Sequence, residues 1–474
     1  MAPRRDLSPA DACWLYSEWE NNHQTVSAFL WADGRVDLDD FRDIVRTRLV
    51  ERYPVFRQKV VMSRNPVMMP HWEDDPSFDI DRHIVEVELP APGDRAALEA
   101  LVSAQRSPLL DRDHPLWTIY LIQGCDGGTS AVHARIQHSI ADGWSLVRLF
   151  LSLTDEDEAD EADEANGPAS EREQAAVGDE GIDEEATDER AGDAERAGDA
   201  ERGRESPLRL RRRTARVVRR VRRAAHPAAV AAGRDALDET LTVVADPSRF
   251  VEFGTDVSES LARQVQDAGV RVMEAGRFAR YGIRDGIDFT FPPRPGRTVL
   301  HGDVSGTKRV AWMHPVPLAP VKAAGRVYGA TINDVLMGAQ TNALRQYLLD
   351  RDALDVDELF TAVPVSLRAA DEPLPEDLGN RFGLVPVLLP VGEPDPLAQV
   401  LAIKRQVDEI KQSTMPIMSF GLMGFSALTT PDVERLIHKL NQAHSIGVTT
   451  NVPGPRHEVR LCGVRVAGMW GMGG

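Results

Sequence analysis

Apolar residues recur at strand or helix spacing through most of this chain. Between Leu38 and Tyr53 they fall at helical intervals, and Ser8 followed by Pro9 marks the start of an earlier helix. Thr25 to Leu30 alternates toward the pattern of a strand, and Thr118 to Gln123 is predicted as a strand that Gly124 to Gly128 turns back. The N-terminal part is therefore predicted to mix strands and helices.

The C-terminal half repeats this alternation of elements. Helices are predicted there at Leu318–Val327, Thr331–Leu349 and Asp395–Gln412, and strands at Gly306–Met313, Leu359–Val365, Phe382–Leu389 and Ile446–Val452. A further helix of the N-terminal part is predicted at Pro92–Gln105. Asn333 and Asp334 are expected to cap the longest of these helices. Strands and helices that alternate in both halves indicate an α/β or α+β fold.

Two stretches in the middle of the chain depart from this pattern. Thr154 to Ser206 holds 22 Asp/Glu against 5 Arg, or −17 of the net charge of −19, and has few large apolar residues. It is predicted to be disordered, with a helix as the alternative. Leu208 to Ala225 holds nine arginines with apolar residues at helical spacing, which predicts a basic amphipathic helix.

The basic helix has three interpretations. It binds a membrane or lipid-droplet surface, it docks on the neighbouring acidic strip, or it is a solvated connector. Nucleic acid is not expected as a partner, because no aromatic residues interleave the arginines. The first interpretation predicts a peripheral, lipid-associated protein.

Length and composition predict a soluble protein with two domains. The 474 residues exceed what one hydrophobic core normally holds, and no apolar run is long enough to span a bilayer. The N-terminus lacks the apolar segment of a secretory signal, so a cytoplasmic location is expected. Three distant cysteines do not suggest disulfides or a structural zinc. The predicted segments are an N-terminal domain (1–153), the acidic insertion (154–206), the basic helix with its connector (207–235) and a C-terminal domain (236–474).

Candidate chemistry lies at the end of one strand. Ala131 to Ser145 alternates and then delivers His138 to a turn that contains Asp142 and Gly143. A histidine placed in this way can act as a general base. A histidine whose hydrogen bonds only stabilise its loop would show the same short pattern.

This stretch, QHSIADG, resembles the HHxxxDG motif of the wax ester synthase/diacylglycerol acyltransferase family. That family belongs to the wider HxxxD acyltransferases, with chloramphenicol acetyltransferase and condensation domains. Further matching segments follow in the same order: LSPADACWLY, Pro115-Leu116-Trp117, Asn333-Asp334-Val335, Pro364 to Arg368, Gly379-Asn380 and Asn451 to Pro455.

The resemblance implies two chloramphenicol-acetyltransferase-like domains packed as a pseudo-dimer around a central tunnel. In it, His138 would take the proton of an alcohol or diacylglycerol that attacks acyl-CoA directly, with acyl-CoA as co-substrate and no bound cofactor or metal. An oxyanion donor is expected in Asn333 or Thr450, with Asp334 and Asn451 beside them positioning the substrate. Rivals are an enzyme of the same class with another acceptor and a weakly catalytic, lipid-coating homologue.

The remaining motif residues are expected to be structural. Asp142 is predicted to pair with Arg368 and orient the loop, and Gly379-Asn380 to support the tunnel. Pro115-Leu116-Trp117 lines the tunnel or is plain core, and Met415 to Leu428 lines the acyl channel or is a helix packing face. Gln137 replaces the first motif histidine, which predicts an altered acceptor preference or rate. The chain ends where the family's relatives are expected to continue, so an exposed sheet edge is expected there.

Overall fold

The computed structural model describes residues 5–63, 68–156, 296–302, 304–369, 372–427, 434–435, 438–439, 445–455 and 457–473. Leu208 to Ala225, and all but the first three residues of the acidic strip, lie outside the described residues. The predicted domain boundaries in this region therefore stay predictions. No helix in the described part of the chain combines the length and the apolar character needed to cross a bilayer.

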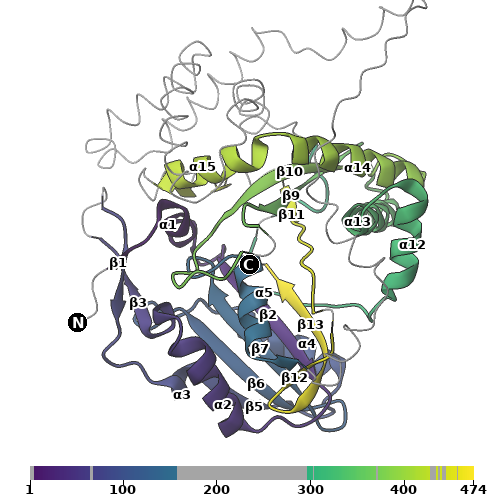
Figure 1. The fold of residues 1–474 in the computed structure, drawn as a ribbon. Coiled ribbons are helices and arrows are strands. Elements are labelled where there is room, and N and C mark those ends of the chain that lie inside the picture. Colours follow the sequence, from purple (N-terminus) through teal and green to yellow (C-terminus); the bar gives the residue numbers. More distant parts are fainter. Residues whose placement is uncertain are drawn as a thin grey trace, which may run out of the picture. The chain divides into compact units, whose positions relative to one another are not determined.

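The largest element is a seven-stranded mixed sheet (Figure 1). Its strands, in spatial order, are β5 (Ile84–Glu88), β6 (Trp117–Cys125), β7 (Thr129–Gln137), β2 (Thr25–Ala32), β13 (Val464–Met472), β12 (Val459–Leu461) and β8 (Asp155–Glu156). β6 and β7 form the predicted hairpin, and β7 pairs antiparallel with β2 so that Gln137 lies opposite Thr25. β13, from the other end of the chain, continues the sheet beside β2.

Side chains alternate between the two faces of this sheet, and both faces carry apolar residues. Helices therefore pack on both faces. On one face, Leu98 and Val102 of α4 (Arg95–Arg106) pack on Phe29, Ile122 and Ala131. On the other, strand residues including Val132, Ala134 and Ile136 pack with side chains of α2 (Leu38–Val45) and α5 (Gly143–Ser152). The two cores hold β7, and therefore the turn that follows it, in a fixed position.

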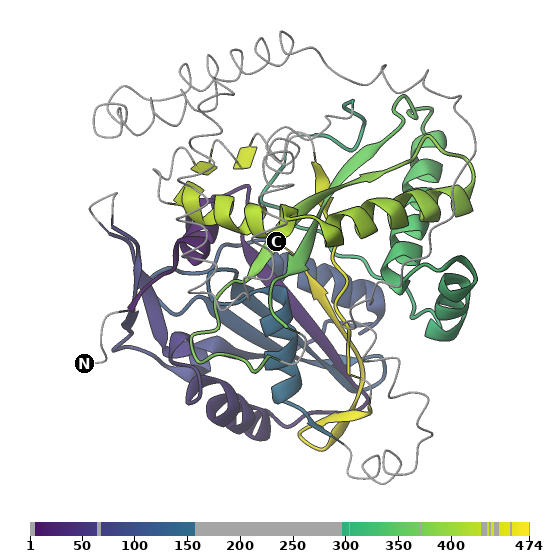
Figure 2. The ribbon, with the colours of Figure 1, turned by 45° about the horizontal axis from the view of Figure 1, so that its top comes forward.

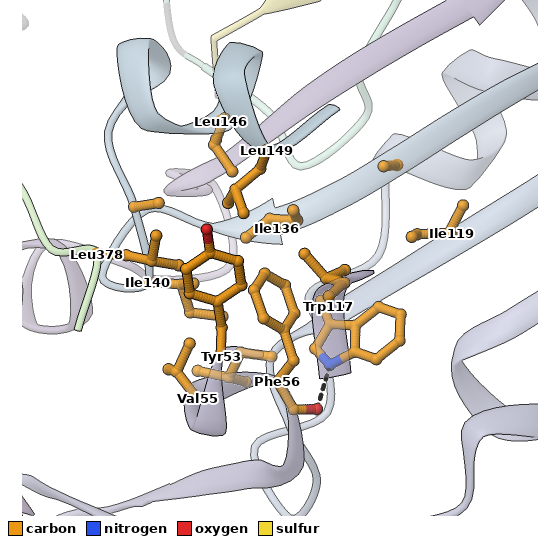
Figure 3. Packing of buried hydrophobic residues seen from close by; sticks show 14 of the residues in the cluster. Tyr53, Val55, Phe56, Trp117, Ile119, Ile136, Ile140, Leu146, Leu149 and Leu378 are labelled. Carbon is orange, nitrogen blue, oxygen red and sulfur yellow. Dashed lines mark hydrogen bonds between the residues drawn. The ribbon is translucent and has the colours of Figure 1, made fainter. Parts of the chain in front are cut away.

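The core beside β7 contains Trp117, which is 1% exposed. Its indole Nε1–H donates to the carbonyl of Phe56 at 2.8 Å, and the two rings meet edge to face (Figure 3). Tyr53 and Leu149 belong to the same cluster of buried side chains. Of the two interpretations of the Pro115-Leu116-Trp117 motif, this packing favours core over tunnel.

A second sheet is formed by the C-terminal part. It has the order β10 (Phe382–Leu389), β9 (Leu359–Ser366), β11 (Ser445–Val448), and its core includes residues of α13 (Ile332–Leu349) and α14 (Pro396–Gln412). Figure 2 shows α14 lying along β10, where Gln406 donates to the backbone carbonyl of Leu388 at 2.9 Å and accepts from its N–H at 3.0 Å. The remaining described elements are β1 (Arg5–Asp6), α1 (Pro9–Tyr16), η1 (Arg46–Val50), η2 (Pro54–Arg57), β3 (Gln58–Val61), β4 (His71–Asp74), α3 (Ile80–His83), α12 (Leu318–Tyr328) and α15 (Met415–Ala427).

The predicted strand at Gly306–Met313 is wrong. No strand is formed there, because backbone donors of the segment are satisfied by side chains of α4 and its C-cap instead of by a neighbouring strand. The N–H groups of Lys308, Val310 and Trp312 donate to Ser107 Oγ, Ser103 Oγ and Glu99 Oε1 respectively.

Two helix ends also differ from the prediction. The cap of α13 is Thr331, whose hydroxyl accepts from the N–H of Asp334 while the Asp334 carboxylate accepts from Thr331 in return. The helix expected from Leu38 to Tyr53 changes at Arg46 into the π-helical stretch η1. The strand predicted at Ile446–Val452 is shorter, and ends at Val448.

Candidate active site

His138 stands at the first position after β7. Its backbone N–H donates to the carbonyl of Gln24 at 2.7 Å, which extends the pairing of β7 with the β2 side by one residue. Its ring stacks on the indole of Trp14 with centroids 4.1 Å apart, and Phe382 lies 5.4 Å away. Aromatic rings from α1 and β10 therefore fix the plane of the imidazole.

Asn380 determines which nitrogen of His138 carries the proton. The Asn380 Nδ2 group donates to Asp11 Oδ1 and to the His138 carbonyl, both at 2.7 Å. These two bonds use both amide hydrogens, so the amide oxygen must face His138 Nδ1, at 2.9 Å. The hydrogen-bond network thus assigns the proton to Nδ1 and leaves a lone pair on Nε2.

The surroundings also keep the imidazole neutral. Burial lowers the pKa of His138 below its ordinary value of 6.5, while a bond to its own backbone carbonyl, the charge of Asp142 and the bond to Asn380 oppose the shift. A neutral ring with a bare Nε2 can accept a proton at pH 7.

Asp11 supports Asn380 from behind. Its Oδ1 accepts from both the backbone N–H and the side chain of Asn380, at 2.9 and 2.7 Å, and its Oδ2 accepts from Ser8 Oγ at 2.6 Å. Burial raises the pKa of Asp11 to about 6, against the hydrogen bonds that lower it. Asp11, Asn380 and His138 form one connected chain of polar groups.

Asp142 and Arg368 hold the turn after His138. Asp142 caps α5 by accepting from the N–H of Ser145 at 2.8 Å, and its other oxygen accepts from the N–H of Arg381 at 3.0 Å. The expected pairing with Arg368 is present, with Nε 3.6 Å from Asp142 Oδ2. Arg368 Nη2 donates to the carbonyls of Leu378 and Gly379, so it ties the Asn380 loop to the motif turn.

The two motif glycines differ in their local need for glycine. Gly379 has a φ of +68°, donates its N–H to the Ile140 carbonyl at 3.1 Å and lies close to the Asp11 carboxylate. A side chain there would be strained and would crowd Asp11. At Gly143 an added Cβ would meet no atom within 4 Å in the described part of the chain. The space beside Gly143 is open at the start of α5.

Gln137 is fully buried and acts on the backbone around His138. Its Nε2 donates to the carbonyl of Trp14 at 3.2 Å, and its Oε1 accepts from the N–H of Ser139 at 2.6 Å. The amide therefore joins the motif turn to α1 through these two hydrogen bonds.

The expected oxyanion residues are not brought to His138 by any described contact. Asn333 donates to Met337 Sδ at 3.5 Å, and Asp334 is occupied in the capping box of α13. Thr450 and Asn451 are exposed after β11. A different donor does lie beside the ring, because the buried indole Nε1–H of Trp14 has no hydrogen-bond partner among the described residues.

A cavity of about 230 Å³ approaches this network from the α1 side. Asp11, Ser139 and Ile140 form the part of its wall next to the motif turn, and it is completed by Arg5, Asp6, Leu7, Ser8, Trp72 and Asp377. Groups of three or more His, Cys, Asp and Glu side chains able to hold a metal ion are not found in the described part of the chain.

The sequence reasoning missed Asp11, Trp14 and Phe382 as neighbours of His138. Asp11 and Trp14 lie in the matching LSPADACWLY segment, but Asp11 also fits the pattern of a residue in the first turn of a helix capped by Ser8. That ordinary role hid its contact with Asn380, which is 369 residues away in the chain.

Models of known protein families match most of the chain. The model of the wax ester synthase/diacylglycerol acyltransferase catalytic domain matches residues 7–336, and that of the WS/DGAT C-terminal domain matches residues 378–473. The chain belongs to this family. As a WS/DGAT protein it is an O-acyltransferase that takes acyl-CoA as its donor substrate.

Its relatives share moderate identity over most of their length. A probable diacylglycerol O-acyltransferase of Mycobacterium tuberculosis is 25% identical over 472 residues, which cover 98% of this chain and 84% of the relative. The O-acyltransferase WSD of Acinetobacter baylyi is 24% identical over 403 residues, which cover 84% of this chain and 72% of the relative.

The predicted fold class is confirmed by a solved member of the family. The wax ester synthase/diacylglycerol acyltransferase of Marinobacter aquaeolei VT8 aligns over 99% of this chain and 86% of its own, with 19% identity and a TM-score of 0.54. The WS/DGAT chain therefore has the mixed α/β architecture expected from its motifs. The central tunnel stays a prediction.

Proposed function

We propose that His138 is the general base for acyl transfer from acyl-CoA to the hydroxyl of a long-chain alcohol or a diacylglycerol. The observation that carries this proposal is the bare Nε2 of a neutral imidazole, with Nδ1–H directed at Asn380 and the ring stacked on Trp14. An oriented general base typically contributes about 10²–10⁴-fold to the rate.

The reaction follows from that geometry in two steps. Nε2 takes the hydroxyl proton as the alcohol oxygen attacks the thioester carbonyl carbon. The tetrahedral adduct then breaks its carbon–sulfur bond, and the departing sulfur receives the proton from Nε2 to give CoA and the ester. No residue becomes acylated, so the positive charge on His138 is transient. Asn380, held by Asp11, stabilises the protonated ring through Nδ1–H.

The adduct oxygen needs a hydrogen-bond donor, a contribution often worth several kcal/mol. Asn333 and Thr450 remain the candidates from the sequence. We add the Trp14 indole Nε1–H to them, because it is buried, lacks a partner among the described residues and belongs to the ring that stacks on His138.

The choice of acceptor rests on the relatives. The Mycobacterium tuberculosis relative is named a probable diacylglycerol O-acyltransferase, and the family description includes wax ester synthesis. Gln137 replaces a motif histidine and bonds to the backbone of Trp14 and Ser139, so the chemistry is expected to survive this change. The acceptor preference is where we expect Gln137 to act.

Product analysis with the full chain tests the reaction. Radiolabelled palmitoyl-CoA is supplied with hexadecanol, a diacylglycerol or a short polar alcohol, and the esters are separated. Labelled wax ester or triacylglycerol supports the proposal, whereas ester from the polar alcohol alone assigns another acceptor. An equivalent of CoA released without acceptor, with an acyl adduct on the protein, would overturn direct attack.

We also propose that the enzyme works at a lipid surface through Leu208 to Ala225. The support is the sequence alone, with nine arginines and apolar residues at helical spacing. Flotation with anionic liposomes compares the full chain with a variant in which the nine arginines are glutamine. Equal flotation of the two proteins would remove the reason for this proposal.

A further inference from the structure

Three cationic side chains gather on the α4 face of the large sheet. Arg135 of β7, Arg106 at the end of α4 and Lys308 in the segment that crosses α4 line one narrow pocket. His23, Thr25 and Ser27 complete its wall. The pocket has almost no open volume in this structure. We call these six residues the basic pocket.

The cations of the basic pocket lack carboxylate partners. None of the three forms an ion pair with a residue that the structure describes. Arg135 has a hydrogen bond with the Tyr120 side chain, and the carboxylate of Glu18 attracts it less strongly. That carboxylate is itself bound by Arg112 at 3.1 Å and by the backbone N–H of Gln24 at 3.2 Å. Burial, followed by repulsion from a neighbouring arginine, lowers the pKa of both Arg106 and Lys308. Unpaired like charges in a half-buried place are costly unless an anion joins them.

Three buried polar atoms in the wall, His23 Nδ1 among them, lack partners in the described part of the chain. Arg135 is 3% exposed, and Thr25 is 5% exposed. The Nε of Arg135 and the hydroxyl of Thr25 form no hydrogen bond with the described residues, although Arg135 Nη2 donates to the carbonyl of Pro108. Buried donors are nearly always satisfied in folded proteins, so the Arg135 Nε–H and the Thr25 hydroxyl indicate a missing acceptor.

The basic pocket lies close to the proposed base. Arg135 precedes His138 by three residues, which is about 10 Å along a strand. Thr25 and His23 flank Gln24, whose carbonyl accepts the backbone N–H of His138 at 2.7 Å. An anion in the pocket would therefore be near the reacting thioester, at a separation that a pantetheine arm can span.

We propose that the basic pocket binds a phosphate group of the acyl-CoA substrate. Arginine and lysine side chains with a free hydroxyl are suited to phosphate oxygens, and CoA is the phosphate-bearing substrate of this enzyme class. Because the pocket has almost no open volume here, side chains of its wall must move to admit the phosphate. This inference rests on the proposed function, because it assigns part of the donor substrate to a site next to His138.

Calorimetric titration of the full chain with CoA tests the assignment without turnover. Lys308→Ala removes a half-buried cation on a segment without regular secondary structure, so it is expected to fold. Its Kd for CoA should rise about tenfold, the loss typical of one charge-assisted hydrogen bond. The matched control Arg309→Ala removes the neighbouring exposed cation and should change Kd by less than twofold. Pantetheine, which has the arm without its phosphates, should bind both variants equally.

The same titrations can overturn the proposal. Equal Kd values for CoA in Lys308→Ala and Arg309→Ala would remove the pocket from CoA binding, as would a parallel loss for pantetheine. If Lys308→Ala raises the Kd for inorganic phosphate but leaves the Kd for CoA unchanged, the pocket is a site for free phosphate instead. His138→Ala should bind CoA with the Kd of the wild type. The binding test is therefore independent of whether His138 is the general base.

Discussion

Replacing Asn380 by alanine tests how His138 is positioned. The substitution removes three hydrogen bonds of the side chain: the one accepted from His138 Nδ1 at 2.9 Å and the two donated to Asp11 and the His138 carbonyl at 2.7 Å. At about 0.5–1.5 kcal/mol each, their loss amounts to about 2–4 kcal/mol, shared between fold stability and the orientation of the ring.

The expected kinetic result for Asn380→Ala is a fall in kcat of about 10–100-fold, by analogy with the loss when the hydrogen-bond partner that orients a metal-bound histidine is removed. The KM for acyl-CoA should stay nearly unchanged, because Asn380 acts on the ring and not on the donor. CoA release is followed with a thiol reagent at saturating acceptor. Thermal melting measures how much of the lost hydrogen-bond energy lowers the stability of the fold.

The control for this variant is Asn342→Ala on α13, which removes a half-buried amide away from the network. A kcat for Asn380→Ala within twofold of this control would refute the positioning role. A fall in kcat that follows only the fraction of unfolded protein would refute it as well.

Three further predictions concern pH, Asp11 and the core. The kcat/KM should rise with pH through one ionisation below 6.5, since burial lowers the pKa of His138 and only the neutral ring accepts a proton; an ionisation above 6.5 would contradict this. Because burial raises the pKa of Asp11 from 3.8 to about 6, the folded state binds this proton more tightly, so stability should fall as pH rises from about 4 to 6, by about 3 kcal/mol. Asp11→Asn should flatten that fall in urea unfolding at pH 4.5 and 7.5, and an unchanged slope would count against the shift. Trp117→Ala should cost about 3–5 kcal/mol in the same assay while kcat of the folded fraction is retained; lost kcat at full stability would restore the tunnel interpretation.

Local patterns predicted most elements because they depend on neighbouring residues. The period of two in β7 and the Ser8-Pro9 helix start both appear in the structure. The strand predicted at Gly306 to Met313 is absent because the backbone N–H groups of this extended segment donate to helix side chains. The sequence pattern of such a segment is the same as that of a strand in a sheet.

The site was predictable only through the family motifs. They indicated His138, Asp142, Arg368 and Asn380, but the short sequence pattern could not show that Asn380 sets the tautomer of a histidine 242 residues away. The basic pocket was missed for the same reason, because Arg106, Arg135 and Lys308 come from separate elements. Contacts of this kind arise from tertiary packing and leave no local period in the sequence.

The most direct test of the central claim is the rate of CoA release by His138→Ala with acyl-CoA and the preferred acceptor. His314→Ala serves as the matched control, since His314 is exposed and outside the network. We predict that His138→Ala loses about 10²–10⁴-fold in kcat while the control keeps the wild-type rate. Equal rates of CoA release in the two variants would contradict the assignment of His138 as the base.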